Sequence, residues 1–270
     1  MSKNMTYVHG YDKRESIRLE DQAETLADLL HFDTRYPAGS IVLEAGCGVG
    51  SQTISLASNS PHAKIISVDI SESSLSEAKK RIKDAGHTNV VFQKEDILNL
   101  PFQEKSFDHI FVCFVLEHLS QPVKALNCLK TLLKPNGTIT VIEGDHGSAY
   151  FYPDSMQARK AISCQIELQK MAGGNPNIGR EVYPLLKSSG FHDIDVSPRM
   201  VYVDSSKPSL VEGFTKNTFT SMIEGVRESA LKACLIDEKT FDEGIKALYR
   251  TSQQDGVFCY TFFKAVAVNR

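Results

Sequence analysis

The chain has 270 residues, of which 41% are hydrophobic and 23% are charged, and 30 basic against 33 acidic side chains leave a formal net charge of −3. Proteins that bind nucleic acids carry basic surfaces, so this balance argues against DNA or RNA as a partner. The N-terminus has no apolar stretch typical of a signal peptide, and no run approaches the roughly 18 apolar residues of a membrane span, so we expect a cytoplasmic protein.

Strand-like and helix-like segments alternate from residue 40 to residue 144. The strand-like runs are nearly continuous Val and Ile stretches, which are typical of parallel strands covered by helices on both faces. One helix has candidate caps at Ser71 and Ser74 and a stop signal at Gly86. The pattern predicts a doubly wound, Rossmann-like α/β sheet. Strands are expected at 40–46, 64–70, 89–97, 108–116 and 138–144, and helices at 51–59, 71–86 and 121–137.

After residue 145, longer helical segments interrupt this alternation. Ligands of open α/β sheets bind at the edge where these segments leave the sheet. We therefore expect the helical insertions 146–178 and 205–255 to wall a substrate chamber, while the alternative, that they only cover the sheet edge, stays open. Helices are expected at 155–172, at 179–190 and within 205–255, and strands at 191–204 and 256–269, of which the last can be antiparallel.

The run E-A-G-C-G-V-G at residues 44–50 follows the first predicted strand. A glycine-rich turn lets a ligand approach the backbone closely. A dinucleotide fingerprint, G-x-G-x-x-G, would require glycine at position 51, which is Ser51, and Glu44 would repel a pyrophosphate. The acid instead favours a ligand with an ammonium group and no phosphate. S-adenosylmethionine is such a ligand, although an NAD-dependent oxidoreductase remains an alternative.

Acidic residues also end the next two predicted strands. Asp69 is placed to accept hydrogen bonds from both hydroxyls of a ribose, and Asp96 from an adenine amino group that Ile97 would cover. NAD would require the same acid at position 69, so Asp69 alone does not discriminate between the cofactors. Either acid could also cap the helix that follows it.

These motifs, together with S-F-D-H-I-F-V-C-F-V-L-E-H-L at 106–119 and L-K-P-N-G-T-I at 133–139, resemble the class I S-adenosylmethionine-dependent methyltransferases. The resemblance is strongest to the small-molecule branch typified by ubiquinone/menaquinone-biosynthesis methyltransferases. It covers residues 36–145 well and residues 179–191 moderately. It implies a seven-stranded sheet with an antiparallel last strand. It further implies that Glu44, Gly46, Cys47 and Gly48 line the methionine part of the cofactor, Asp69 and Ile70 the ribose, and Asp96 and Ile97 the adenine, with Cys113, Phe114 and the helix residue Gln52 as further cofactor contacts.

The N-terminal segment is expected to close the cofactor site. A helix from about Glu15 would place Arg18 and Gln22 one turn apart on one face, where Arg18 could clamp the methionine carboxylate with help from Gln22 and Tyr11. The alternative is an ordinary surface arginine. We thus expect residues 1–270 to form a single methyltransferase domain, with a helical cover at 1–35 and the cofactor-binding core at 36–145.

Methyl transfer from a sulfonium is an in-line displacement, so the protein must position the acceptor and exclude water. If the acceptor has to lose a proton, His118 and His146 are the candidate general bases, because each follows the carboxyl end of a predicted strand. A solvated or cap-bonding histidine is the alternative for both. We expect no metal, because Asp145 and His146 have no third ligand at suitable spacing and the six cysteines form no C-x-x-C pair.

The acceptor is expected to be a small molecule. The fourth predicted strand ends in C-F-V-L-E-H, and not in the Asn/Asp-Pro-Pro-Tyr turn of methyltransferases that act on adenine or glutamine. No Pro-Cys dipeptide is present to supply a nucleophile toward cytosine. We expect a monomer or homodimer, and a cofactor-binding protein without turnover remains a further alternative.

Overall fold

The computed structural model describes residue 23 and residues 25–270. These residues form two compact units, each assembled from separate stretches of the chain. The first, which we call the core unit, consists of residues 27–144, 178–199 and 263–270. The second, the helical unit, consists of the described residues up to Leu26 and of residues 145–177 and 200–262.

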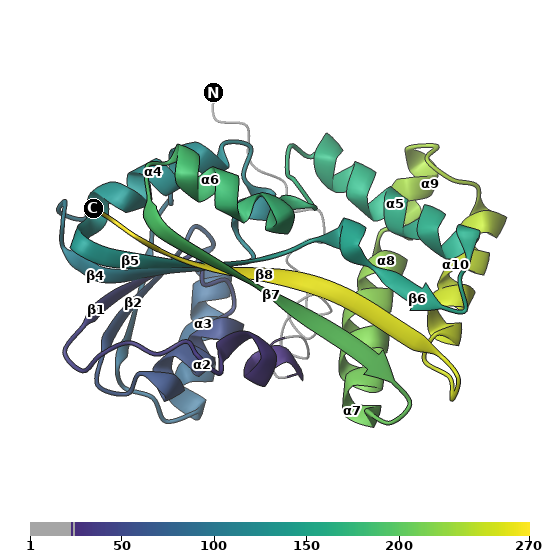
Figure 1. Ribbon diagram of the computed structural model, residues 1–270, viewed down its shortest axis with the longest axis horizontal. Helices are drawn as coiled ribbons and strands as arrows, with labels where there is room; N and C mark the ends of the chain where they lie inside the picture. Colours follow the sequence, from purple (N-terminus) through teal and green to yellow (C-terminus); the bar gives the residue numbers. More distant parts are fainter. Residues whose placement is uncertain (1–22, 24) are drawn as a thin grey trace. The chain divides into compact units, whose positions relative to one another are not determined.

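The described residues contain one eight-stranded sheet with the order β3-β2-β1-β4-β5-β8-β6, and β7 pairs with β8 (Figure 1). Pairs β1–β2, β2–β3, β1–β4 and β4–β5 are parallel, whereas β6 and β8 are antiparallel. The strands are β1 Ile41–Ala45, β2 Lys64–Asp69, β3 Val90–Lys94, β4 Phe107–Cys113, β5 Leu133–Gly144, β6 Tyr150–Tyr152, β7 His192–Asp204 and β8 Val257–Val268.

The expected doubly wound, mostly parallel sheet is confirmed, and so is the antiparallel last strand. The expected count of seven strands is wrong, because Tyr150–Tyr152 adds an eighth, β6. Three residues are too few for strand periodicity to appear in the sequence. The apolar runs have their expected cause: in β1, Val42 and Leu43 are fully buried because helices cover both faces.

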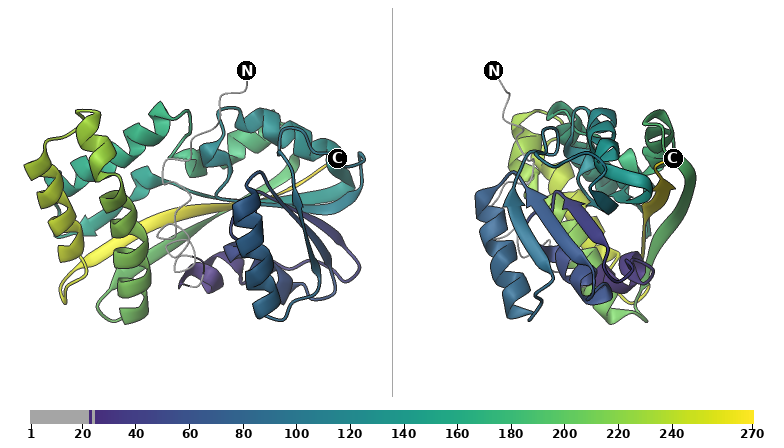
Figure 2. Two further views of the ribbon diagram at one scale, coloured as in Figure 1. Left: turned by 180° about the vertical axis from the view of Figure 1, so that it is seen from behind. Right: turned by 90° about the vertical axis from the view of Figure 1, so that its left-hand side faces the viewer.

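Helices lie on both faces of the sheet in the core unit, with α4 and α6 on one face and α2 and α3 on the other (Figure 1). Helices α2 and α3 pack side by side, as the view from behind in Figure 2 also shows. Ser71 caps α3 as predicted, since its side chain accepts the N–H of Ser74 at 3.2 Å. The helices are α2 Ser51–Asn59, α3 Glu72–Asp84, α4 Pro122–Leu132 and α6 Val182–Ser188, with 3₁₀ turns η1 Leu116–His118 and η3 Ile178–Glu181.

The helix expected at 121–137 is shorter than predicted. It ends at Leu132, and β5 begins at Leu133, where the backbone is extended with φ −75° and ψ 134°. Pro135 explains the early stop, because a proline lacks the N–H that a helix needs and disfavours helical geometry in the residue before it.

A buried lysine fastens β8 to the loop before β1 within the core unit. The Lys264 ammonium donates to Asp33 Oδ1 at 2.6 Å, to Thr34 Oγ1 at 2.5 Å and to the Leu30 carbonyl at 3.2 Å. Arg199 from β7 donates to the other oxygen of Asp33 at 2.5 Å. Burial lowers the pKa of Lys264, and the Asp33 carboxylate opposes that shift. The network is one tie that joins three distant parts of the sequence.

The helical unit packs its helices around an aromatic core. Phe214 and Phe219 contact Phe258 and Tyr260 of β8, with ring centroids 4.7 to 6.0 Å apart. The helices expected at 155–172 and within 205–255 are confirmed. Within the described residues, no helix combines the length and apolar character that a membrane span requires. The helices are α5 Met156–Met171, α7 Pro208–Leu210, the π-helix η4 Val211–Thr220, α8 Ser221–Gly225, α9 Arg227–Lys232 and α10 Glu238–Arg250, with the 3₁₀ turn η2 His146–Ser148.

Candidate functional site

The glycine loop between β1 and α2 contains three left-handed residues, Gly46, Gly48 and Gly50, with φ of 80°, 52° and 79°. A Cβ on Gly46 would lie 2.5 Å from a methyl group of Val115, and one on Gly50 would lie 2.9 Å from the Cβ of Ala78. A Cβ on Gly48 would have no atom of the described residues within 4 Å. Two of the glycines are therefore required by packing inside the protein, and Gly48 faces open space in the described part of the chain.

Four N–H groups of this loop donate to acceptors within the protein. Those of Gly46 and Cys47 donate to the Val68 carbonyl at 2.8 and 3.0 Å, and that of Gly50 donates to the Cys47 carbonyl at 2.9 Å. The Gly48 N–H donates to Asp69 Oδ2 at 2.8 Å. A pyrophosphate needs free backbone donors. These four donors are therefore not free for a pyrophosphate, and one of them meets a carboxylate, which agrees with the preference for a cationic ligand.

Asp69 lies at the carboxyl end of β2, as predicted, and is partly buried. Its Oδ1 accepts the Ser71 N–H at 2.9 Å, while Oδ2 accepts the Gly48 N–H. A carboxylate has about four acceptor positions, so two remain for a ligand. Next to it, Ile70 is 55% exposed and offers an apolar surface.

Glu44 is almost completely buried at the end of β1, with 2% of its surface exposed. Its Oε2 accepts hydrogen bonds from Ser67 at 2.6 Å and from Thr53 at 2.8 Å. Burial raises the pKa of Glu44 to about 7, although these two hydrogen bonds oppose the shift and the Asp69 carboxylate adds to it. Neither hydroxyl partner is indicated by the motif around Glu44. Ser67 could have been noticed as the polar residue within the apolar run I-I-S-V.

The residues after β3 divide between surface and core. Asp96 is exposed, and its Oδ1 accepts the Leu98 N–H at 2.9 Å, so it supports the local backbone of a turn. Ile97 is 9% exposed and packs into the hydrophobic core.

The end of β4 also contributes residues to the candidate site. Cys113 is 8% exposed, and burial, together with the nearby Glu143 carboxyl, raises the pKa of its thiol well above the ordinary value. Phe114, which follows, has φ of 58°, a left-handed conformation that is uncommon for an aromatic residue. Its N–H donates to the Ile142 carbonyl of β5 at 2.9 Å. Such backbone outliers concentrate at functional sites.

Gln52 in the first turn of α2 has a partner that the sequence did not indicate. Its Oε1 lies 2.6 Å from Nε2 of His31, a buried side chain. Burial lowers the pKa of His31 to about 4, so the ring is neutral at pH 7 and its Nε2–H donates to Gln52. The oxygen of Gln52 is thereby held toward the protein.

The two candidate bases belong to different units. His118, in the core unit, has Nε2 3.5 Å from Glu117 Oε1 and keeps a quarter of its side chain exposed. His146, in the helical unit, is 8% exposed, and its Nδ1 lies 2.8 Å from the Tyr260 hydroxyl. His146 is therefore not a solvated histidine. Asp145 caps its turn by accepting the Gly147 N–H at 3.1 Å. The described part of the chain brings no three His, Cys, Asp or Glu side chains together as a metal site would require.

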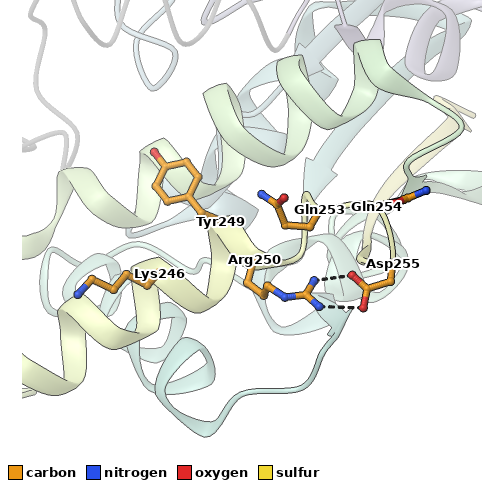
Figure 3. Close-up of a pocket in the computed structure, with 6 residues that line it drawn as sticks. All are labelled: Lys246, Tyr249, Arg250, Gln253, Gln254 and Asp255. Atoms are coloured by element: carbon orange, nitrogen blue, oxygen red, sulfur yellow. Dashed lines mark hydrogen bonds and ion pairs between the residues drawn. The ribbon is translucent and has the colours of Figure 1, made fainter.

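Tyr11, Arg18 and Gln22 lie outside the described residues, so their roles stay predictions. A surface groove of about 580 Å³ lies at the end of α10 in the helical unit (Figure 3). Arg250 and Asp255 form a bidentate ion pair across it, with N–O distances of 2.7 and 2.8 Å. None of the predicted site residues that the structure describes lines it. The lining residues are Lys246, Tyr249, Arg250, Gln253, Gln254 and Asp255.

Comparison with known proteins agrees with this geometry. A family model described as "Methyltransferase domain" matches residues 38–190, which is more than half of the chain. The chain therefore belongs to the methyltransferase-domain family. The resemblance to class I S-adenosylmethionine-dependent methyltransferases inferred from the sequence is confirmed at this level.

Among the relatives, an uncharacterized methyltransferase of Schizosaccharomyces pombe is 31% identical over 147 residues, which cover 52% of each chain. A demethylmenaquinone methyltransferase of Staphylococcus saprophyticus is 31% identical over 134 residues, covering 49% of this chain and 57% of the relative. The chain spans about half the length of these curated relatives. A solved structure of Haemonchus contortus phosphoethanolamine N-methyltransferase 2, in complex with phosphomonomethylethanolamine and S-adenosylhomocysteine, shares the fold. Its TM-score is 0.59 at 19% identity, over 95% of this chain and 58% of that one.

Proposed function

We propose that the protein transfers a methyl group from S-adenosylmethionine to a small-molecule acceptor by in-line displacement. The observation that carries the proposal is the glycine loop, in which four N–H groups donate to acceptors within the protein and beside which the carboxyl groups of Glu44 and Asp69 lie. This arrangement suits an adenosine ligand that is cationic and lacks phosphate. The family to which the chain belongs supports the same conclusion.

The residues present fit that cofactor. The open space at Gly48 leaves room for a ligand over the loop, and Asp69 keeps acceptor positions for two ribose hydroxyls. Ile70 and Asp96 are exposed at neighbouring strand ends, where they would meet the ribose and the adenine amino group. When bound, S-adenosylmethionine supplies a methyl group activated by its sulfonium.

Glu44 would attract the methionine ammonium group by its charge, because the side chain itself is almost completely buried. With a pKa of about 7, this carboxyl is poised between its neutral and ionised forms at neutral pH. A cation beside it would favour the ionised form. Cys47, 7% exposed, and the left-handed Phe114 would border the same part of the ligand.

The chain's own contribution to the reaction is positional. His118, whose Nε2 lies 3.5 Å from Glu117 Oε1, is the first candidate to take up a proton if the acceptor must lose one. His146, hydrogen-bonded to Tyr260, is the second candidate base. The predicted role of residues 146–178 and 205–255 as walls of the acceptor chamber belongs to the same proposal. Several relatives are demethylmenaquinone methyltransferases by name, which supports a small-molecule acceptor.

Isothermal titration calorimetry with S-adenosylhomocysteine and with NADH tests the cofactor. We expect binding of the first and none of the second. Asp69→Asn should weaken S-adenosylhomocysteine binding by about ten- to a hundredfold, because a charge-assisted hydrogen bond contributes about 1.5–3 kcal/mol. Asp84→Asn, at the exposed end of α3, is the matched control and should bind like the wild type.

Transfer itself is tested by incubating the protein with methyl-labelled cofactor and extracts of small metabolites. Label in a small molecule supports the proposal. Tight cofactor binding without label in any metabolite would instead indicate a binding protein without turnover, and NADH bound at the glycine loop would overturn the proposal.

A further inference from the structure

Glu143, next to last in β5, is a completely buried acid that interrupts the apolar run V-I-E-G. Its Oε1 accepts the backbone N–H groups of Val115 at 3.1 Å and of Leu116 at 2.8 Å. Its Oε2 is buried and has no hydrogen-bond partner among the described residues. A buried acid with only one hydrogen-bonded oxygen requires an explanation, because burying an unpaired polar atom costs free energy.

The two N–H groups belong to the turn that follows β4. This turn starts with Phe114, which has φ of 58°, and continues into η1, where His118 lies. The Val115 side chain also packs against the glycine loop, since it occupies the space that a Cβ on Gly46 would need. One carboxyl group thus anchors the segment that carries two predicted site residues and borders a third.

The burial of Glu143 also changes its pKa. Burial, with the carboxylate of Glu117 as the second cause, holds the pKa of Glu143 well above its ordinary value. The backbone N–H groups of Val115, Leu116 and Glu117 oppose that shift, because hydrogen bonds from these donors stabilise the ionised carboxylate.

The backbone at Glu143 is held as firmly as its side chain. A Cβ on Gly179 in η3 would lie 3.0 Å from the Glu143 carbonyl oxygen and 2.7 Å from that of Gly144. Only glycine allows η3 to pack this closely on the end of β5. Because the strand end is held, the position of the carboxyl group fixes the position of the turn.

We propose that Glu143 is a positioning residue of the cofactor site, which acts through the N–H groups of Val115 and Leu116 to fix the turn carrying Phe114 and His118. The inference rests on the proposed function only in that S-adenosylhomocysteine is used as its probe. Glutamine can replace the acid, because its amide oxygen can accept the same two N–H groups and it carries no charge.

The test compares Glu143→Gln, Glu143→Ala and the wild type by calorimetry with S-adenosylhomocysteine and by amide hydrogen exchange at Val115 and Leu116. Glu143→Gln should bind within about twofold of the wild type. Glu143→Ala should bind at least about tenfold more weakly and exchange both amides at least about tenfold faster, because two buried donors lose their acceptor. Thr140→Val is the matched control in the same strand, since Thr140 is buried and accepts a hydrogen bond from Tyr36 at 3.3 Å. It should lose stability without a change in binding or in those two amides.

The outcomes separate the two proposals. A wild-type protein with no affinity for S-adenosylhomocysteine would count against the proposed function, whereas amide exchange still tests the anchor. Faster exchange in Glu143→Ala with unchanged affinity would overturn the positioning role. Equal damage in Glu143→Gln and Glu143→Ala would also overturn it, because the charge and not the acceptor geometry would then be essential. If Glu143→Ala fails to fold, Glu143→Gln decides alone: wild-type affinity and amide exchange support the positioning role, and weakened binding overturns it.

Discussion

Replacing Glu44 by glutamine should change how the stability of the protein depends on pH. The carboxyl group of Glu44 is buried, and its pKa is raised from 4.5 to about 7 in the folded chain. Between these two values the native state holds a proton that the unfolded chain has already lost, so the free energy of unfolding falls as pH rises. Above about pH 7 the contribution is fully lost and the profile is flat with respect to this group.

The size of the effect follows from the same two values. A pKa raised from 4.5 to about 7 corresponds to about 3 kcal/mol, a large fraction of the stability of an ordinary domain. His31 acts in the opposite direction, because burial lowers its pKa from 6.5 to about 4 and its contribution is lost as pH falls through that range. The two windows overlap, so the contributions of these two groups to the wild-type profile should nearly cancel between about pH 4.5 and 6.5.

Urea unfolding at half-unit pH steps from 4.5 to 8 measures this directly. Relative to the wild type, Glu44→Gln should expose the His31 contribution, with stability that rises from pH 4.5 to 6.5. Relative to the wild type, His31→Gln should expose the Glu44 contribution, with stability that falls from pH 4.5 to 7. The double variant should run nearly parallel to the wild type between about pH 4.5 and 6.5. Parallel curves for the wild type and Glu44→Gln would refute the reasoning, since they would mean that Glu44 titrates alike in both states.

Three further outcomes follow from the structure. Gly46→Ala should lower the free energy of unfolding in urea by at least about 2 kcal/mol, because the new Cβ would meet a side chain at 2.5 Å. Gly48→Ala has free space among the described residues and should lower it by only about 1 kcal/mol. Equal losses of stability in the two variants would contradict the packing argument. Lys264→Met should lower stability by at least about 2 kcal/mol in the same assay, since the buried Thr34 hydroxyl and Leu30 carbonyl lose their donor, and an unchanged midpoint would count against the network. Native alkylation followed by mass spectrometry should label the exposed Cys234 and spare the buried Cys113, and labelling of both at similar rates would oppose this.

Most of the fold could be predicted from the sequence because its signals are local. Val and Ile runs with helices between them specify a buried parallel sheet, and Ser71 caps α3 as its position predicts. The exceptions lack such signals. Strand β6 has three residues and exists through its pairing with β8, and the helix after Gln121 ends early because of Pro135.

The candidate site was only partly predictable, for a different reason. Acids at strand ends, such as Asp69, and the glycines of the loop after β1 can be predicted as site residues from their residue type and position in the sequence. The acceptors of the loop N–H groups cannot be predicted, because nearly every residue has the same backbone donor and only the fold decides which acceptor it meets. Ser67, which binds Glu44, and Glu143 itself are polar residues inside apolar strands, a signal that is visible but gives no partner, whereas Thr53, the other hydroxyl on Glu44, lies in helix α2.

The internal hydrogen bonds of the glycine loop also affect the thermodynamics of ligand capture. A loop whose amides already have acceptors is ordered when the chain folds, so an arriving molecule does not have to restrict that backbone. Affinity at this position then reflects the quality of the new contacts, with little entropic penalty from the receptor. Preorganisation of this kind favours a loop that keeps one shape through the filling and emptying of the site.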